Sequence, residues 1–291
     1  MKKYLKIRGK ENEDIYIKGD KIYTSILKAP IENVKEMADG SYIGNIDNRY
    51  VYLKKTLWGD YYTSLTNKII VPICLCSEKL DTVFCLVSRN ANTSIVLSAM
   101  KLEGFDSDNY SNDNFLWHDN NAMKFCQEKG LIKDLSKVDF SKYSNFVIVL
   151  DDPLKRFIRT TYKILRDKNV IPHLNNCKSI DNLDRFLDEL IFYTDICEND
   201  INFLWERHVG MQYRYVNACL HYNPTLTIVK LDELPSWWEE TYNVKWFKNN
   251  VSKNKPITKE SFSKEQWNKV EKLLEKDIGL WNNVLKLLEK K

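Results

Sequence analysis

Apolar and polar residues follow two different patterns along this chain. Within the first 80 residues they alternate one by one over residues 14–26 and 42–53, and Gly, Asp or Asn residues typical of turns interrupt each stretch. Such alternation predicts β-hairpins. A further strand is expected over residues 68–76. We therefore predict a β-rich N-terminal subdomain, residues 1–80, with its boundary near residues 78–81.

From residue 82 onward, continuous apolar runs alternate with stretches of helical periodicity. The runs are typical of strands buried on both faces and occupy residues 83–87, 145–150 and 225–230. Helices are expected from residues 93–94 to 100, from residue 153, over 179–196 and 235–242, and from a capping box at Ser263 to about Leu288. This order predicts an α/β domain with a central parallel sheet flanked by helices over residues 81–291.

The stretch from Thr82 to Met100 carries the clearest chemical signal. It predicts a buried strand, a short polar loop at residues 88–92 and then the start of a helix. The unpaired N–H groups of a helix N-terminus attract phosphate-like anions. The hydroxyls of Thr93 and Ser94 add donors, and Arg89 adds a charge that can hold two oxygens. The paired glycines and lysine of the Walker motif are absent.

Composition narrows the class of protein. The 291 residues carry a formal net charge of +4, which suits a small anionic ligand better than a long nucleic acid, so no nucleic-acid partner is expected. The seven cysteines form neither a redox nor a zinc pattern, and we interpret them as mostly buried thiols in a reducing compartment. The sequence shows neither a signal-peptide core nor an apolar run of about 18 residues, so no integral membrane segment and a cytoplasmic location are expected.

Four segments in order resemble signatures of the sulfotransferases that use 3′-phosphoadenosine-5′-phosphosulfate (PAPS), in particular the carbohydrate sulfotransferase branch. The family's Pro-Lys-x-x-x-Thr-Ser is similar to residues 88–94, and its Arg-Asp-Pro-Leu-Glu-Arg-Phe to residues 151–157. Its Asp-x-His-Trp-x-Pro-Gln resembles residues 206–212, and its Lys/Arg-x-Glu-x-Leu resembles residues 230–234. With a similar closing helix, the likeness spans about Val83 to Trp281.

The resemblance implies a P-loop-like sulfotransferase fold and assigns roles at the first motif. PAPS would be the donor, PAP (adenosine 3′,5′-bisphosphate) the product, and no metal would be needed. Arg89 stands at the family's lysine position and would stabilise the bridging oxygen of the leaving group. The cradle for the 5′-phosphosulfate would be built by the main chain of the following loop with two hydroxyl side chains: Asn90, Ala91, Asn92, Thr93 and Ser94. An ordinary strand–loop–helix connection is the alternative.

A catalytic base is expected for the acceptor hydroxyl. His118 lies at about the distance from the cradle at which the carbohydrate branch has a histidine, and a neutral imidazole can take the proton during attack. Asp119 beside it either orients the imidazole ring or is an ordinary polar residue of the loop. His208, in the third motif, is the competing candidate. On sequence alone, a single histidine is more often a surface or packing residue.

Two positions depart from the family pattern. The family's arginine before Asp-Pro and a serine eight residues later bind the 3′-phosphate, but here these positions are Asp151 and Arg159. We expect Arg159 to restore the positive charge and to pair with Asp151, and we interpret Arg156 as part of a structural ion pair. The loop at residues 248–255 matches a segment that covers the nucleotide, with candidate contacts at Asn250, Ser252 and Lys253; a solvated basic loop is the alternative.

These features predict a sulfotransferase that transfers a sulfuryl group from PAPS to a hydroxyl of a glycan or glycolipid. The Lys- and Asn-rich composition would suit an AT-rich microbial genome, and a bacterial surface polysaccharide would be a suitable acceptor. A catalytically inactive protein of the same fold that binds a glycan or nucleotide is the first alternative. A kinase-like phosphotransferase is the second, disfavoured by the missing Walker lysine. The sequence does not specify the oligomeric state.

Overall fold

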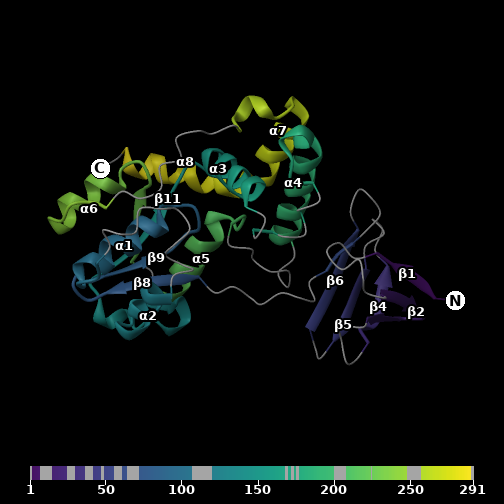
Figure 1. The fold of residues 1–291 in the computed structure, drawn as a ribbon, viewed down its shortest axis with the longest axis horizontal. Coiled ribbons are helices and arrows are strands. Elements are labelled where there is room, and N and C mark those ends of the chain that lie inside the picture. Colours follow the sequence, from purple (N-terminus) through teal and green to yellow (C-terminus); the bar gives the residue numbers. More distant parts are fainter. Residues whose placement is uncertain are drawn as a thin grey trace. The chain divides into compact units, whose positions relative to one another are not determined.

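A computed structural model gives the structure of the chain (Figure 1). It describes residues 2–6, 15–24, 30–36, 42–46, 49–55, 61–63, 72–106, 120–167, 170–171, 174, 177–199, 208–223, 225–247 and 257–289. The chain divides into two compact units, one of Met1–Ile70 with Lys163–Val209 and one of Val71–Tyr162 with Gly210–Lys291.

The first unit contains two small antiparallel sheets. One has the order β1-β2-β3, with strands Lys3–Leu5, Ile15–Lys18 and Lys21–Thr24. The other has the order β4-β5-β6-β7, with strands Glu32–Glu36, Tyr42–Ile46, Arg49–Lys55 and Tyr61–Thr63. Both predicted hairpins are confirmed, as β2–β3 and β5–β6. Gly19 adopts a φ of 65° in the first turn, a value that glycine tolerates without strain.

The two small sheets share one apolar core. A bridge between Ile22 and Ile31 links β3 to the residue before β4, and the buried side chains come from both sheets: Leu5, Ile15, Ile22, Ile31, Tyr42 and Leu53. A Cβ on Gly44 would lie 2.6 Å from the Ile31 side chain. This close approach explains why β5 has a glycine within the strand.

The first unit also contains a long amphipathic helix. A 3-10 turn at Ile180–Asn182 leads into α4, Leu183–Asn199, as the sequence predicts for residues 179–196. Phe186, Leu187 and Leu190 are fully buried. Their spacing of three and four residues places them on one face of the helix.

The second unit is built on a mixed five-stranded sheet with the order β10-β8-β9-β11-β12. Its strands are β8 Ile73–Ser77, β9 Thr82–Cys85, β10 Ile132–Asp134, β11 Asn145–Leu150 and β12 Thr227–Lys230. β9, β11 and β12 are parallel, but β8 and β10 are antiparallel to their neighbours. The prediction of a parallel sheet therefore holds for three strands only.

The position of β8 also differs from the expected domain boundary. The strand expected over residues 68–76 is confirmed over Ile73–Ser77, but it pairs with β9 in the mixed sheet. The boundary expected near residues 78–81 thus falls in the turn between two paired strands. Continuous apolar runs do not reveal whether a strand pairs with the preceding or the following part of the chain.

Seven helices lie wholly or largely in the second unit, among its described residues: α1 Asn92–Leu102, α2 Asn120–Glu128, α3 Pro153–Arg166, α5 Gln212–Tyr222, α6 Leu234–Tyr242, α7 Lys264–Leu273 and α8 Glu275–Leu288. The division between the units falls within α3. Further 3-10 turns occupy Leu135–Lys137, Phe140–Lys142 and Lys259–Ser261.

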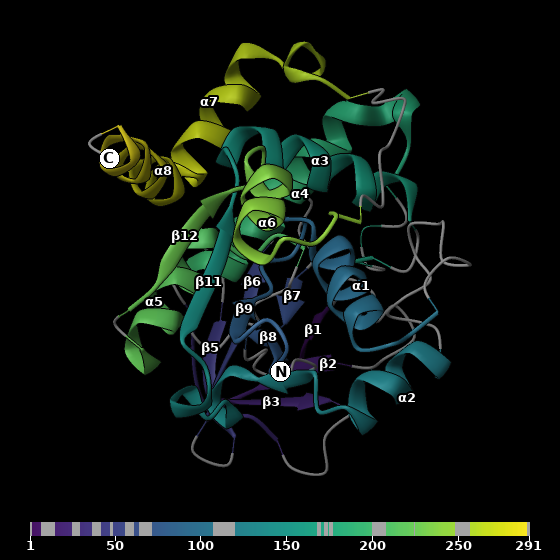
Figure 2. The same cartoon turned by 90° about the vertical axis from the view of Figure 1, so that its left-hand side faces the viewer.

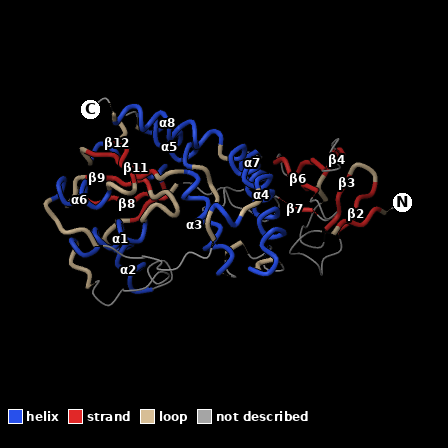
Figure 3. Tube along the Cα trace, turned by 90° about the horizontal axis from the view of Figure 1, so that it is seen from above, coloured by secondary structure: helices blue, strands red, loops and turns tan. Residues whose placement is uncertain are grey.

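Helices cover both faces of the mixed sheet (Figures 2 and 3). On one face, α1, α2 and α6 pack on alternate residues of the strands, such as Phe84 and Val147. α6 contributes Trp238 to this core. On the other face, Cys85 of β9 approaches Cys219 of α5. This two-sided cover explains why β9 and β11 are almost entirely apolar and buried.

Polar residues begin several helices as the sequence predicts. Asp152 accepts hydrogen bonds from the N–H groups of Leu154 and Lys155 at the start of α3. Ser263 and Gln266 form the predicted capping box of α7. The final helix is nevertheless two helices, because the chain departs from helical geometry at Leu274.

Candidate functional site

The loop between β9 and α1 has an unusual main-chain conformation. Arg89 and Ala91 both have positive φ, 72° and 59°, a region that residues other than glycine rarely adopt. These two left-handed residues turn the chain sharply between the end of β9 and the start of α1. Ala91, the residue at the N-cap of α1, makes no side-chain cap, and the N-terminus of a helix attracts anions.

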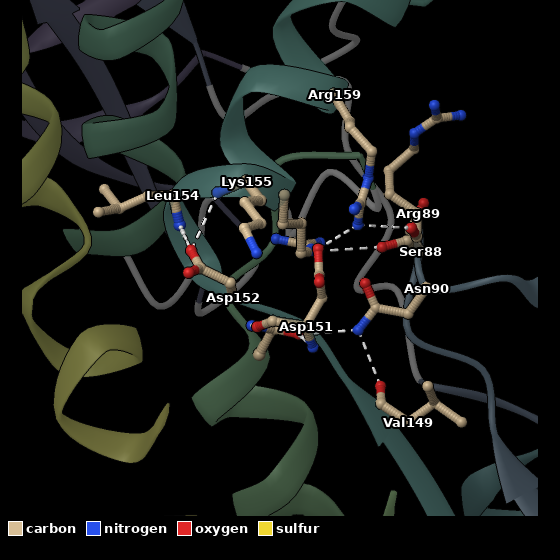
Figure 4. Close-up of polar contacts among 11 residues, drawn as sticks. Ser88, Arg89, Asn90, Val149, Asp151, Asp152, Leu154, Lys155 and Arg159 are labelled. Carbon is tan, nitrogen blue, oxygen red and sulfur yellow. Dashed lines mark hydrogen bonds and ion pairs between the residues drawn. The ribbon is translucent and has the colours of Figure 1, made fainter. Parts of the chain in front are cut away.

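Asn90 fixes this loop to the neighbouring strand. Its side chain is fully buried, and its Nδ2 donates to the Val149 carbonyl at 2.8 Å and to Gln212 Oε1 at 2.7 Å (Figure 4). The Asn90 side chain therefore has a structural role in the expected cradle. The main-chain N–H of Asn90 donates to the Val87 carbonyl at 3.1 Å, so it too is used within the loop.

Gln212 connects the two strand ends. Its Oε1 accepts from the Asp151 N–H at 2.9 Å, and its Nε2 donates to the Asp151 carbonyl at 2.8 Å. Together with the bond from Asn90, this amide ties the β9–α1 loop to the end of β11. A buried amide that forms three hydrogen bonds is held in a single orientation.

Asp277 positions Gln212 from α8. Its carboxylate accepts the N–H of Gln212 at 2.9 Å and that of Tyr213 at 2.8 Å, which caps the start of α5. Burial raises the pKa of Asp277, and the nearby Arg156 opposes that rise. Four segments of the second unit thus meet here: the β9–α1 loop, the end of β11, α5 and α8.

Asp151 and Arg159 form the ion pair that the sequence predicts. The Arg159 guanidinium contacts the Asp151 carboxylate and donates to the Arg89 carbonyl at 3.3 Å. Figure 4 shows Arg159 extending from α3 toward this point, whereas the Arg89 side chain extends away from Asp151. Burial raises the pKa of Asp151, and Arg159 opposes the rise. Arg159 therefore links α3 to the β9–α1 loop and to the loop after β11, which we call the strand-end loops.

Arg156 lies one turn before Arg159 and is buried, with 4% of its surface exposed. Its Nε donates to the Ser88 carbonyl at 3.2 Å. Burial lowers its pKa, and the Asp277 carboxylate favours the charged form. Its Nη2 is buried without a hydrogen-bond partner among the described residues. Among the described residues Arg156 makes no direct ion pair, so the expected pairing is not confirmed; its structural contact is the bond to the Ser88 carbonyl.

The groups at the edge of the mixed sheet where β9 and β11 end suit an anionic ligand. The loops after the parallel strands β9 and β11 lie side by side, and ligands of open α/β sheets bind at such strand ends. The N-terminus of α1 and the Arg89 side chain belong to one short loop. Asn92 and Thr93 are half-buried at the helix start, and Ser94 is buried. Tetrahedral oxyanions are the ligands that such donors prefer.

Several predicted site residues cannot be compared with this arrangement. His118, Asn250, Ser252 and Lys253 lie outside the described residues. His208 is half-buried in a turn and belongs to the first unit, whereas the strand-end loops belong to the second. The roles expected for these five residues stay predictions.

The sequence did not assign the linking roles of Gln212 and Asp277. Gln212 stands in the third resembling segment, and Asp277 stands in the closing helix. A buried polar residue in the first turn of an otherwise apolar helix face is the signal that could have identified Asp277. The partners of Gln212 lie 61 and 122 residues away, so no local pattern encodes them.

The described part of the chain has neither a metal-binding cluster nor a membrane-spanning helix. There, no group of three or more His, Cys, Asp or Glu side chains could hold a metal ion. No described helix has the length and apolarity needed to cross a membrane. Comparisons of the chain with protein-family models, with curated proteins and with solved structures found no match.

Proposed function

We propose that this protein transfers a sulfuryl group from PAPS to a hydroxyl of a glycan or glycolipid. One observation carries the proposal. The two segments that resemble the donor-binding motifs of sulfotransferases, residues 88–94 and 151–157, lie at the ends of adjacent parallel strands, and Arg159 contacts both. The loops after adjacent parallel strands lie side by side in any open α/β sheet, so the specific support is Arg159, which contacts both loops from the position expected to supply the cation.

The proposed reaction is an in-line displacement at sulfur. The acceptor oxygen forms a new bond to sulfur while the bond between sulfur and the bridging phosphate oxygen breaks, and PAP leaves with the electron pair. The N–H groups at the start of α1 hold the 5′-phosphate, and Arg89 neutralises the charge on the bridging oxygen. The acceptor proton passes to a base, for which His118 and His208 are the candidates.

The 3′-phosphate of PAPS would lie near the end of β11, where Arg159 supplies the cation. Asp151 reduces that charge, because the two side chains already form an ion pair. Binding of a phosphate here requires Arg159 to turn from the carboxylate toward the ligand, or to hold both. The affinity for the donor should therefore depend strongly on this pair.

The same ion pair favours a second candidate, a protein of this architecture that binds a nucleotide or glycan without catalysis. A carboxylate beside the donor phosphate weakens binding by repulsion. The two candidates differ in turnover, because only the enzyme converts PAPS to PAP faster than buffer does.

The test is release of PAP from PAPS in the presence of a panel of bacterial polysaccharides and lipo-oligosaccharides. The Arg89→Ala variant should lose about 100-fold to 1,000-fold in rate, the usual effect of removing one charge-stabilising group. Arg166→Ala, which removes an exposed arginine at the end of α3, is the matched control and should retain the full rate. Wild-type turnover no faster than buffer across the panel would favour the binding protein.

The cysteines are consistent with a protein that resides in a reducing compartment, and we include this location in the proposal. Six cysteines are described, and all six are buried and free. Burial raises the pKa of the Cys76 thiol to about 12 and that of Cys126 to about 11. Thiols of this kind are inert at neutral pH.

A further inference from the structure

The sheet formed by β1, β2 and β3 has a face that does not contribute to the core. Leu5, Ile15 and Ile22 point into the shared apolar core. Strand residues alternate between the two faces, so the opposite face carries one tyrosine from each strand and four lysines. We call these residues the tyrosine–lysine face: Lys2, Tyr4, Lys6, Tyr16, Lys18, Lys21 and Tyr23.

The three tyrosines form one row across the sheet. Tyr4 lies directly opposite Tyr16, and Tyr16 lies directly opposite Tyr23. The ring centroids of Tyr16 and Tyr23 are 5.2 Å apart with an angle of 14° between the planes, and those of Tyr4 and Tyr16 are 5.6 Å apart. The end of the row is open, because Tyr4 is 63% exposed.

The same face carries positive charge with little compensation. Lys2 lies over the Tyr16 ring at 4.3 Å from its centroid. Lys18 and Lys21 are directly opposite each other, an arrangement that like charges make unfavourable. Glu32 pairs with Lys21 at 2.7 Å. Within residues 2–6 and 15–24, the single carboxylate is that of Asp20 in the turn.

From the row and the charges we infer that the tyrosine–lysine face binds an acidic polysaccharide. Carboxylates of the polysaccharide would pair with Lys2 and Lys18, which are exposed on this face. The exposed Tyr4 ring offers a flat apolar surface to the C–H face of a sugar, and its hydroxyl offers a hydrogen bond. This site is separate from the strand-end loops, and it does not depend on the proposed sulfuryl transfer.

Geometry argues against two other anionic partners. Single-stranded nucleic acids stack successive bases on several accessible ring faces, but Tyr16 and Tyr23 stack on each other and leave Tyr4 as the single exposed ring of the row. Anionic membranes are usually recognised by clusters of about four to eight basic residues or by inserted apolar side chains. The tyrosine–lysine face has four lysines, the lowest number in that range, and no exposed aliphatic residue that could insert.

The experiment measures binding of polygalacturonate to the full chain by titration calorimetry at about 0.15 M salt. Uncharged dextran, an oligothymidylate and anionic vesicles serve as comparison ligands. Lys2→Gln/Lys18→Gln and, separately, Tyr4→Thr each change exposed residues of the face. Lys264→Gln/Lys272→Gln removes the same charge from exposed positions of α7 and serves as the matched control.

We expect polygalacturonate to bind and dextran not to bind. The double lysine variant should bind at least about tenfold more weakly, and Tyr4→Thr should also bind more weakly, whereas the control should change less than about twofold. Circular dichroism verifies that each variant is folded. The inference is overturned if wild-type protein does not bind polygalacturonate, if control and test variants lose equal affinity, or if the oligothymidylate or the vesicles bind more tightly.

Discussion

Replacing Gln212 with leucine tests whether the strand-end loops are held together as described. Leucine has a similar size but removes three hydrogen bonds, one from Asn90 and two with the main chain of Asp151. Asn90 retains its bond to the Val149 carbonyl. The N–H and carbonyl of Asp151 lose their partners while buried.

The size of the effect follows from these two orphaned groups. A buried polar group left without a partner costs about 1–3 kcal/mol. The extra apolar surface of leucine offsets about 1 kcal/mol of this cost. We therefore expect the free energy of unfolding to fall by about 3 kcal/mol, a large share of the stability of a typical domain.

Urea unfolding followed by tryptophan fluorescence measures this change. Trp238 is fully buried in the core of the same unit and reports its unfolding. Gln127→Leu, on the exposed surface of α2, is the matched control and should change stability by less than about 0.5 kcal/mol. A loss below about 1 kcal/mol in Gln212→Leu would refute the proposed network.

Three further predictions concern other parts of the chain. Asp151→Asn should raise the affinity for adenosine 3′,5′-bisphosphate and Arg159→Ala should lower it, measured by calorimetry; equal affinities would remove the pair from the donor site. Iodoacetamide should label at most one of the seven cysteines in the native protein, because six are buried, and mass spectrometry that finds several labels would contradict this burial. Burial lowers the pKa of Lys178 from 10.5 to about 8, so its contribution to stability is complete above pH 10.5 and lost as the pH falls through about 8. In urea titrations between pH 10.5 and about 8, the stability of Lys178→Gln should lack this part of the pH dependence. Identical pH profiles of wild type and variant would refute the lowered pKa of Lys178.

Local patterns in the sequence predicted the elements whose signals are local. Residues 145–150 form a strand with the expected bounds, since a short apolar run next to an Asp-Asp-Pro helix start leaves few alternatives. The capping box at Ser263 likewise marked the start of α7. The direction of β8 and the break at Leu274 depend on contacts with distant segments, and no periodicity reports those contacts.

The candidate site was predictable in part for the same reason. The β9–α1 loop follows from a short motif, whereas the pairing of Asp151 with Arg159 was expected from the resemblance to the sulfotransferase motif. The bonds of Gln212 to Asn90 and Asp151 join residues far apart in the chain. The left-handed conformations of Arg89 and Ala91 also escaped prediction, because neither residue type favours a positive φ.

The central proposal is that the strand-end loops bind a nucleotide with phosphates at both the 3′ and the 5′ positions. Calorimetric titration of the full chain with adenosine 3′,5′-bisphosphate, AMP and ATP tests it most directly. We predict that the bisphosphate binds at least about tenfold more tightly than AMP, because Arg159 adds a charged contact to the 3′-phosphate. Equal affinity for AMP and the bisphosphate, tighter binding of ATP, or no binding of any of the three would contradict the proposal.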